Sequence, residues 1–315
     1  MSDTIMVTGA CGFIGSHFVR MLNDMDYDGS IVILDKLTYA GNKENLEGLP
    51  EGRYDLCVGD IADAKFMDEI FKRYHPTYVV NFAAETHVDR SIASSTEFTM
   101  TNFIGVQILL DACLGYNVKR FLQVSTDEVY GDVCENRKAS RETDILAPSS
   151  PYSASKAAAD LLVLSYVRTH KMDAVITRCT NNYGSNQYPE KLIPLMITKA
   201  MMGEKVPVYG QGDNIRDWIC VSDHCMGIWM ALTQGIAGEI YNFASGDLRT
   251  NIEVVKSILN ILGKDESCIE YVKDRKGHDK KYWMSYEKAK EELDWTPVIG
   301  FEQGLSETVE WYKNE

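Results

Sequence analysis

Near the N-terminus the sequence reads Ile5-Met-Val-Thr8-Gly9-Ala-Cys-Gly12-Phe-Ile-Gly15, an apolar run followed by three glycines. The residues Ile14–Leu22 continue with helical periodicity. In a strand, glycine-rich turn and helix of this kind, backbone N–H groups can approach a pyrophosphate. The spacing is G-x-x-G-x-x-G rather than the commoner G-x-G-x-x-G, and any strand-to-helix turn can be rich in glycine. The segment predicts a dinucleotide-binding turn, with an ordinary turn as the alternative.

The rest of the N-terminal half repeats this alternation of short β-branched runs and longer helical patterns. We predict strands at Ile5–Thr8, Ile31–Leu34, Leu56–Val58, Tyr78–Phe82, Arg120–Val124 and Ala174–Arg178, and helices at Ile14–Leu22, Ala64–Tyr74, Phe103–Gly115 and Tyr152–His170. Nearly continuous apolar strands separated by helices indicate a parallel sheet covered on both faces. We therefore expect an α/β protein with a Rossmann-type, doubly wound sheet, whose ligands bind at the carboxyl ends of the strands.

The alternation stops after about residue 179, where we expect a smaller mixed α/β lobe. Two polar segments, Asn181–Tyr188 and Gly203–Asp217, are predicted to be loops. A helix over Ile252–Leu262 begins with a capping box at Thr250–Glu253 and ends at Gly263. These observations predict a cofactor domain at residues 1–178 plus about 219–247, and a substrate lobe at about 179–218 plus 248–315. We expect the active cleft between them.

Charge and cysteine content narrow the class of partner. Lys plus Arg number 32 and Asp plus Glu number 46, so the formal net charge is −14, which disfavours nucleic acid as a partner. A small anionic ligand is compatible, because a few basic residues in one cleft outweigh the distant field. The eight cysteines, Cys134 among them, are scattered without a metal-like spacing. No signal segment is present and no apolar run approaches the ~20 residues that span a bilayer, so we expect a reduced, cytoplasmic protein with neither a metal nor a membrane partner.

Asp35 ends the second predicted strand, 20 residues after Gly15. An acidic side chain there can bind both hydroxyls of the adenosine ribose and repels a 2′-phosphate, which favours NAD over NADP. Lys36 beside it weakens this preference slightly, and a strand-ending aspartate in a turn is the plain alternative. Asp60 and Ile61 follow the third predicted strand, where the same topology would bring them to the adenine.

Pro151-Tyr152-Ser-Ala-Ser-Lys156 opens a predicted helix, and Tyr152 and Lys156 share one face because they are four residues apart. A tyrosine has a pKa near ~10, and lowering it by ~3 units takes about 4 kcal/mol of stabilisation of the phenolate. An adjacent ammonium and a cationic nicotinamide together could supply this. Tyr152 would then act as general base for a sugar hydroxyl while a hydride leaves the attached carbon. Most Tyr-x-x-x-Lys pairs are ordinary helix surface, and the glycine-rich turn in the same chain favours the catalytic interpretation.

A polar cluster, Ser125-Thr-Asp127-Glu128-Val-Tyr-Gly131, follows the strand Arg120–Val124, at the edge where this fold places its chemistry. A hydroxyl beside two carboxyls suggests a reaction that involves more than hydride transfer. Elimination of water from a 4-keto sugar needs a base for the C5 proton and an acid for the departing C6 hydroxyl. Glu128 and Asp127 could divide these roles if their pKa values differ. The alternative is a solvated acidic turn, which the spacing does not exclude.

With these residues considered together, the chain resembles the extended short-chain dehydrogenase/reductase family, and more closely the dTDP-glucose 4,6-dehydratases. The resemblance covers essentially the whole chain. The segments that carry it are Gly9–Gly15, Asp35–Asn42, Ala83–Ser91, Ser125–Gly131, Tyr152–Lys156, Asn181–Gly184, Pro189–Pro194, Arg216–Trp218 and Asp274–Asp279. The chain departs from the family pattern at Lys276 and Ser185, where proline is common, and these departures bear on substrate fit and loop rigidity.

The resemblance implies a role for each matching residue. Tyr152 would take the 4-hydroxyl proton, Lys156 would tune it and hold the nicotinamide ribose, and Thr126 would hydrogen-bond the sugar. Glu128 would remove the C5 proton, Asp127 would protonate the leaving C6 hydroxyl, and Asn182 would orient the nicotinamide. The other implied cofactor contacts are Gly9, Gly12, Phe13, Ile14, Gly15, Asp35, Lys36, Leu37, Thr38, Asp60, Ile61, Phe82, Ala83, Ala84 and Thr101. The implied substrate contacts are Thr86, His87, Thr126, Asn181, Lys191, Leu192, Pro207, Tyr209, Arg216, Asn251, Arg275 and His278.

The resemblance also implies a homodimeric enzyme that dehydrates dTDP-glucose to dTDP-4-keto-6-deoxyglucose, with hydride returned to C6. Dimers of the family use two helices per subunit, which correspond here to Phe103–Gly115 and Tyr152–His170. The nearest alternatives are a 4-epimerase, a uridine-nucleotide dehydratase or a decarboxylase on the same scaffold, and a non-catalytic NAD-binding regulator is the alternative from another class. Asp127 favours dehydration, because the epimerases lack the acidic pair and the decarboxylases resemble Thr-Ser-Glu at this position.

Overall fold

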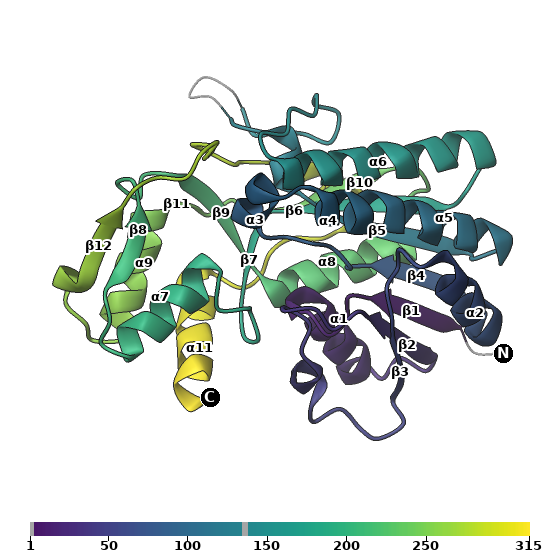
Figure 1. Cartoon of the computed structure of the whole chain (residues 1–315), viewed down its shortest axis with the longest axis horizontal. Coiled ribbons are helices and arrows are strands. Elements are labelled where there is room, and N and C mark those ends of the chain that lie inside the picture. Colours follow the sequence, from purple (N-terminus) through teal and green to yellow (C-terminus); the bar gives the residue numbers. More distant parts are fainter. Residues whose placement is uncertain (1–2, 134–137) are drawn as a thin grey trace.

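The apolar runs of the N-terminal half form the main sheet of the protein (Figure 1). The computed structural model describes residues 3–133 and 138–315. Within these residues the main sheet has seven parallel strands in the order β10-β6-β5-β4-β1-β2-β3. They are β1 Thr4–Thr8, β2 Ser30–Asp35, β3 Tyr54–Val58, β4 Tyr78–Asn81, β5 Arg120–Thr126, β6 Ala174–Cys179 and β10 Ile240–Phe243. The strand order reverses between β1 and β4, where doubly wound sheets bind their ligands, so the predicted Rossmann-type sheet is confirmed.

Helices cover both faces of this sheet, because alternate residues of each strand point to opposite sides. Ile5 and Val7 of β1 pack with Phe18 in one buried cluster, whereas Met6 packs in another, as the two-residue period of a strand requires. The first cluster includes residues of α1 (Phe13–Asp24), α8 (Val221–Gln234) and α10 (Glu287–Leu293). The second includes residues of α2 (Ala64–Tyr74), α5 (Gly105–Gly115) and α6 (Pro151–His170). These two layers fix the strand ends and the residues that follow them.

One helical segment, Thr96–Gly115, is long and apolar enough to cross a membrane by length and composition alone, and 39% of its apolar window is buried. It comprises α4 (Thr96–Thr99), a π-helical turn (Met100–Ile104) and α5, so the prediction that no apolar run approaches this length was wrong. Val106 and Leu109 are fully buried in the cluster that α5 shares with α2 and α6. The segment therefore packs as a core helix on the sheet.

A smaller lobe stands beside the main sheet, at the left of Figure 1. In the described part of the chain it contains a sheet in the order β11-β9-β7 and the strand pair β12-β8. A third buried cluster joins β7, β8, β9 and β12 to α7, α9 and α11. The bounds are β7 Asn181–Tyr183, β8 Val206–Tyr209, β9 Ile215–Cys220, β11 Leu248–Thr250, β12 Ile269–Val272, α7 Leu192–Met201, α9 Asn251–Ile261 and α11 Phe301–Asn314. The expected mixed α/β lobe is present.

The two segments predicted to be loops contain strands. Asn181–Tyr183 forms β7, and Gly203–Asp217 includes β8 and the first residues of β9. The prediction was wrong because these strands are short and because pairing with distant residues fixes them. Asn182, for example, pairs with Ile219, a relationship that local periodicity does not reveal.

Helix α9 has the predicted capping box at its start. The Thr250 hydroxyl accepts a hydrogen bond from the Glu253 N–H at 3.3 Å, and the Glu253 carboxylate accepts one from the Thr250 N–H at 2.7 Å. Gly263 has the positive φ of +64° that suits a residue just after a helix. The remaining helical turns are α3 Val88–Ala93 and 3₁₀ turns at Lys43–Leu46, Asp127–Tyr130 and Glu266–Cys268.

Candidate active site

A pocket lies along the carboxyl ends of β1, β2, β4, β5 and β6 and reaches the smaller lobe. The glycine-rich turn and Asp35 line one part of it, and Thr126, Tyr152 and Lys191 line another. Doubly wound sheets bind ligands at this edge. Every predicted cofactor contact except Leu37 is part of the lining. The structure therefore brings together residues that the sequence spreads over most of the N-terminal half and beyond.

Close backbone approach requires glycine at two positions of the turn. Gly9 has a φ of +68°, and a Cβ there would lie 2.6 Å from the backbone nitrogen of Ala83. A Cβ on Gly15 would lie 2.5 Å from the carbonyl oxygen of Gly9. Helix α1 begins at Phe13 without a side-chain cap, so no side chain occupies the N–H groups of its first turn. A helix N-terminus of this kind can hold an anionic group such as a pyrophosphate.

Asp35 is held at the end of β2 by two backbone donors. Its carboxylate accepts hydrogen bonds from the Cys11 N–H at 2.9 Å and the Leu37 N–H at 2.8 Å, which leaves lone pairs for ribose hydroxyls. Burial raises the pKa of Asp35, and the two N–H donors act in the opposite direction. The Lys36 ammonium lies 2.6 Å from the Asp60 carboxylate. Because Asp60 compensates its charge, Lys36 gives little support to a 2′-phosphate, and the geometry favours NAD.

The polar cluster after β5 forms the 3₁₀ turn η3 (Asp127–Tyr130). The Thr126 hydroxyl accepts a hydrogen bond from the Glu128 N–H at 3.3 Å and donates one to Asp127 Oδ1 at 3.2 Å. Asp127 is 4% exposed, and its Oδ2 has no hydrogen-bond partner among the described residues. Burial, reinforced by the charge of Glu128, raises the pKa of Asp127 well above its ordinary value. A raised pKa favours the protonated form, which suits a carboxyl that acts as an acid.

Three positively charged side chains act on Glu128. It is half-buried, and burial raises its pKa while Arg275, Arg216 and Lys191 lower it. The three cations favour the carboxylate form of Glu128, so it holds a proton less firmly than its neighbour. This difference is what a base and an acid in adjacent positions require.

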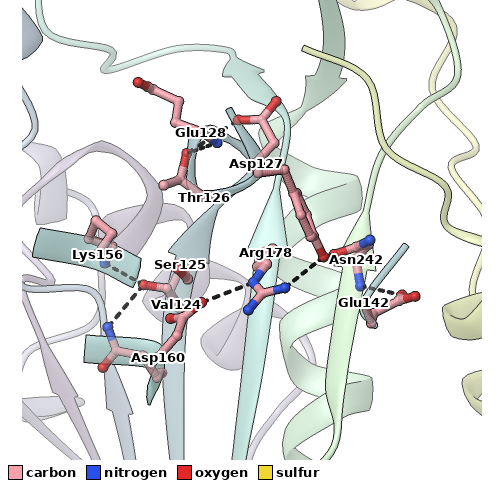
Figure 2. Close-up of polar contacts among 12 residues, drawn as sticks. Val124, Ser125, Thr126, Asp127, Glu128, Glu142, Lys156, Asp160, Arg178 and Asn242 are labelled. Atoms are coloured by element: carbon pink, nitrogen blue, oxygen red, sulfur yellow. Dashed lines mark hydrogen bonds and ion pairs between the residues drawn. The ribbon is translucent and has the colours of Figure 1, made fainter. Parts of the chain in front are cut away.

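Tyr152 and Lys156 project from the first two turns of α6. Ser150 caps this helix and Pro151 occupies its first position, as predicted for a helix that opens here. The Lys156 ammonium donates a hydrogen bond to the Val124 carbonyl oxygen at 2.7 Å (Figure 2). Burial lowers the pKa of Lys156. Strand β5 therefore orients the ammonium at the floor of the pocket.

The surroundings of Tyr152 raise its pKa on balance, and Lys156 is not among the main influences on it. Burial raises this pKa well above its ordinary value, Glu128 and Cys179 raise it further, and contact with Thr126 lowers it. The Lys156 ammonium donates its hydrogen bond to Val124. Positive charge from a cationic nicotinamide in the pocket would favour the phenolate of Tyr152.

The predicted substrate residues occupy different places. Thr86, Thr126, Asn181 and Lys191 line the pocket. Leu192 begins α7, Pro207 lies in β8 and Asn251 begins α9, and these three are not part of the pocket lining. The structure therefore does not bring the whole predicted set to one surface.

Several predicted basic residues lie outside the pocket lining but close to Glu128. Arg216 and Arg275 both lower the pKa of Glu128. Burial lowers the pKa of His278, and the charge of Arg275 lowers it further. The rings of His278 and Tyr209 meet edge to face at 6.1 Å. Arg216 and Arg275 thus form a basic wall on the smaller-lobe side. The remaining predicted residue, His87, lies 3.4 Å from the Glu190 carboxylate.

Sequence reasoning missed several residues of the pocket. They are Leu34, Ala40, Gly41, Gly59, Glu85, Val124, Ser125, Cys179, Thr180, Gln187, Tyr188 and Glu190. Most lie within two positions of a predicted residue, as Glu190 does beside Lys191. The sequence motifs therefore indicated the correct segments, although not these residues. Gln187 and Tyr188 had no such signal, because they follow the strand β7 that local patterns did not predict.

The pocket fits a dinucleotide better than a metal ion. In residues 3–133 and 138–315, no three His, Cys, Asp or Glu residues are grouped as metal ligands. The cysteines of the described part are free, and Cys134 lies outside it. The uncapped N-terminus of α1, the tight approach of Gly9 and the carboxylate of Asp35 match the pyrophosphate and ribose of a dinucleotide.

A glycine-rich turn, an acidic strand end and a Tyr–Lys pair in one pocket define a dinucleotide-dependent enzyme of the short-chain dehydrogenase/reductase type. The family model described as GDP-mannose 4,6 dehydratase matches residues 6–308. The chain belongs to this family.

Individual relatives narrow the comparison. The dTDP-glucose 4,6-dehydratase of Actinoplanes sp. is 49% identical over 315 residues, which cover 98% of this chain and 97% of the relative. The crystal structure of DesIV, a dTDP-glucose 4,6-dehydratase from Streptomyces venezuelae with NAD bound, matches with a TM-score of 0.96 and 44% identity, covering 99% of this chain and 97% of that one. UDP-glucose 4-epimerase from Thermotoga maritima matches with a TM-score of 0.92 and 31% identity over 99% of both chains. The epimerase shares the fold, but the dehydratases are more similar in sequence.

Proposed function

We propose that this protein dehydrates dTDP-glucose to dTDP-4-keto-6-deoxyglucose, with NAD as a cofactor that is returned unchanged. The observation that carries the proposal is that Asp127 and Glu128 share one pocket with Tyr152 and Lys156. An epimerase needs a Tyr–Lys pair, whereas removal of water across C5 and C6 needs a further acid and base. Similarity to the Actinoplanes enzyme over nearly the full chain, and NAD in the DesIV structure, support the same reaction.

The protein's residues divide the proton transfers of this reaction. The glycine-rich turn and Asp35 would hold NAD, which would supply the hydride acceptor for C4 and the hydride donor for C6. Tyr152 accepts the proton of the 4-hydroxyl, Thr126 hydrogen-bonds the sugar, and Lys156 holds the nicotinamide ribose. The 4-keto group acidifies C5, so Glu128 removes the C5 proton, and it returns a proton to C5 when hydride adds to C6. Asp127 gives its proton to the C6 hydroxyl, which leaves as water.

The basic wall is the proposed site of the diphosphate. The Arg216 guanidinium donates hydrogen bonds to the carbonyl oxygens of Ile215 and Asp279 at 2.7 and 2.9 Å and lies 4.2 Å from the centre of the Tyr282 ring. A guanidinium held in this way can bind phosphate with little further loss of side-chain freedom. Arg275 and Lys191 would supply the remaining charge, which offsets the net charge of −14 locally. The further proposed contacts are Thr86, His87, Asn181, Leu192, Pro207, Tyr209, Asn251 and His278.

We assign cofactor binding to residues 1–178 and 219–247, and nucleotide-sugar binding to residues 179–218 and 248–315. The return of the chain to the main sheet at β10 supports this division. Helix α10 packs on the main-sheet side, so residues 287–293 support the cofactor side although the division places them in the substrate lobe. The cytoplasmic location and the exclusion of nucleic acid stay predictions from the sequence.

A homodimer through α5 and α6 is part of the proposal. These helices lie side by side along one surface of the molecule (Figure 1). Leu161 on α6 is 59% exposed, and Met100 in the turn before α5 is 45% exposed. Large apolar side chains at exposed positions of neighbouring helices suit burial against a second copy.

The test is to incubate the purified protein with dTDP-glucose and NAD and to follow product mass and the absorbance of the alkali-treated product. Loss of one water without net NADH accumulation supports the proposal. Unchanged mass with appearance of galactose would identify an epimerase. Turnover of UDP-glucose but not of dTDP-glucose would show that the substrate carries uridine and not thymidine. Bound NAD without turnover of any nucleotide sugar would favour a non-catalytic NAD-binding regulator.

A further inference from the structure

Arg178 is a buried cation near the end of β6, one position before the pocket residue Cys179. It is 1% exposed and heads the group of largest fully buried side chains in the described chain. In the sheet it pairs with Ser125 of β5 on one side and with Asn242 of β10 on the other. Arg178 does not line the pocket, so neither substrate nor cofactor explains a charge at this position.

The guanidinium of Arg178 joins two separate elements. Its Nε donates a hydrogen bond to Asp160 Oδ2 at 2.9 Å, and its Nη1 donates one to the Tyr130 hydroxyl at 2.7 Å (Figure 2). The Tyr130 hydroxyl in turn donates to Asn242 Oδ1 at 2.9 Å. Asn242 is fixed as well, because its N–H donates to the Glu142 carboxylate at 3.0 Å. One planar group therefore sets the distance between Asp160 and Tyr130.

Both partners of Arg178 belong to elements that carry the proposed catalytic groups. Asp160 lies one helical turn after Lys156 on α6, the helix that also carries Tyr152. Tyr130 is the last residue of the turn η3, which begins with Asp127 and Glu128. The hydrogen bonds of Arg178 thus connect two elements. One is the helix with the proposed oxidation pair, Tyr152 and Lys156, and the other is the turn with the proposed elimination pair, Asp127 and Glu128.

The burial of this ion pair points to a role beyond stability. Asp160 is fully buried, and its Oδ1 has no hydrogen-bond partner among the described residues. Buried ion pairs are often no more stabilising than apolar side chains of the same volume, because both charges lose their hydration. A guanidinium has donors in a rigid, planar arrangement, and it can fix geometry in a way that an apolar side chain cannot.

We propose that Arg178 is a positioning residue that holds the turn Asp127–Tyr130 and helix α6 in register, so that the elimination pair and the oxidation pair meet the same substrate. This inference rests on the proposed dehydratase function. It assigns the Tyr130 bond to the alignment of Asp127 and Glu128, and the Asp160 bond to the alignment of Tyr152 and Lys156.

The experiment compares Tyr130→Phe with Asp160→Asn in single-turnover reactions of the full-length protein with NAD and dTDP-glucose. NADH absorbance rises during C4 oxidation and falls after elimination, so both steps are measured in one reaction. Tyr130→Phe removes one hydroxyl and should slow the fall by about tenfold while changing the rise little, because small misplacements of catalytic groups are costly. Asp160→Asn should show the opposite pattern. A merely structural role would change the two steps equally.

Tyr241→Phe is the matched control, because Tyr241 is also a fully buried tyrosine whose hydroxyl donates to a side chain, Glu292 at 2.9 Å. It should leave the ratio of the two steps unchanged. Hydrogen exchange of the protein alone gives a readout independent of activity: the amides of residues 127–131 should exchange about tenfold faster in Tyr130→Phe than in Tyr241→Phe.

Equal slowing of both steps in Tyr130→Phe, or unchanged exchange of the turn, would overturn the proposal. If Asp160→Asn does not fold, Tyr130→Phe with its control still decides. Failure of the wild-type protein to release water from dTDP-glucose would count against the proposed function, whereas the exchange experiment would still test the positioning role of Arg178.

Discussion

The Lys156 ammonium donates a hydrogen bond to the Val124 carbonyl oxygen at 2.7 Å, and this bond ties helix α6 to the end of strand β5. Lys156 is 4% exposed, so the bond compensates part of the cost of burying its charge. Thr126 follows Val124 by two residues on the same strand. The residue proposed to hold the ribose and the residue proposed to meet the sugar therefore share one rigid support.

Tyr152→Phe should abolish the first hydride transfer. The change keeps the buried ring and removes the oxygen that, as a phenolate, is proposed to accept the substrate proton, so NADH formation should fall by about two to four orders of magnitude. The measurement is NADH absorbance in a single turnover with dTDP-glucose, with Tyr241→Phe as control for the loss of a buried hydroxyl. Near-normal NADH formation in Tyr152→Phe would remove Tyr152 from the mechanism.

Asp127→Asn should slow elimination more than C4 oxidation. Burial raises the pKa of Asp127, which favours the protonated acid, whereas the amide that replaces it has the same shape without an acidic proton. NADH should form at close to the wild-type rate and then persist, with water loss slowed about 100-fold. Rapid-quench sampling with mass analysis measures both steps.

Asp173→Asn is the matched control for Asp127→Asn. The Asp173 carboxylate lies 2.7 Å from Arg120 Nε, at the end of β5 opposite to Asp127. It should leave the ratio of the oxidation rate to the elimination rate unaltered. Equal loss of oxidation and elimination in Asp127→Asn would show that Asp127 supports the site generally and is not the acid.

The cofactor part of the site was predictable because its signals are local. The turn Gly9–Gly15, the strand end at Asp35 and the helix start at Tyr152 each follow from spacing within a few residues, and all of them line the pocket. Periodicity identified six of the seven described main-sheet strands for the same reason, since a strand buried on both faces is an almost continuous apolar run. It did not identify β10.

The substrate part was less predictable because distant pairing positions it. Arg216 lies on β9, and the neighbouring Ile215 bridges to Lys281, 66 residues later in the chain. A pattern of neighbouring residues in the sequence does not reveal such a pairing. Arg178 shows the same limit: the sequence identifies it as the end of a strand, but not as a charge buried against Asp160 of the preceding helix.

Asp35→Asn should weaken NAD binding and reduce discrimination against NADP. The amide loses the charge that strengthens hydrogen bonds to the ribose and repels a 2′-phosphate, so the Kd for NAD should rise about tenfold while that for NADP falls. Isothermal titration calorimetry with each dinucleotide measures this. Lys36→Gln is the companion variant: because Asp60 compensates Lys36, it should change the ratio of the two affinities little. Equal weakening of both dinucleotides in Asp35→Asn would show that charge repulsion is not the basis of selection.

His224 should make the free energy of unfolding depend on pH below neutrality. The side chain is fully buried, its Nδ1 lies 2.9 Å from Asn182 Oδ1, and its Nε2 has no partner among the described residues. Because Asn182 Nδ2 donates to the Thr180 carbonyl oxygen at 2.9 Å, Asn182 presents its oxygen to His224, and the Nδ1 carries the proton. Burial lowers the pKa of His224 from 6.5 to about 3.

The sign of the effect follows from where each state binds a proton. Between pH 6.5 and about 3 the unfolded chain protonates His224 and the folded protein does not. The contribution to stability is therefore complete above pH 6.5 and is lost as the pH falls, by about 1.4 kcal/mol per pH unit. His224→Asn removes the titration and keeps a donor for Asn182. Urea unfolding of both proteins from pH 7.5 to 4.5, followed by tryptophan fluorescence, should show the wild-type advantage shrinking at that rate. Buried carboxyls with raised pKa values act in the opposite direction, but they are common to both proteins and cancel in the difference. A difference that does not change with pH would mean that His224 keeps an ordinary pKa in the folded protein.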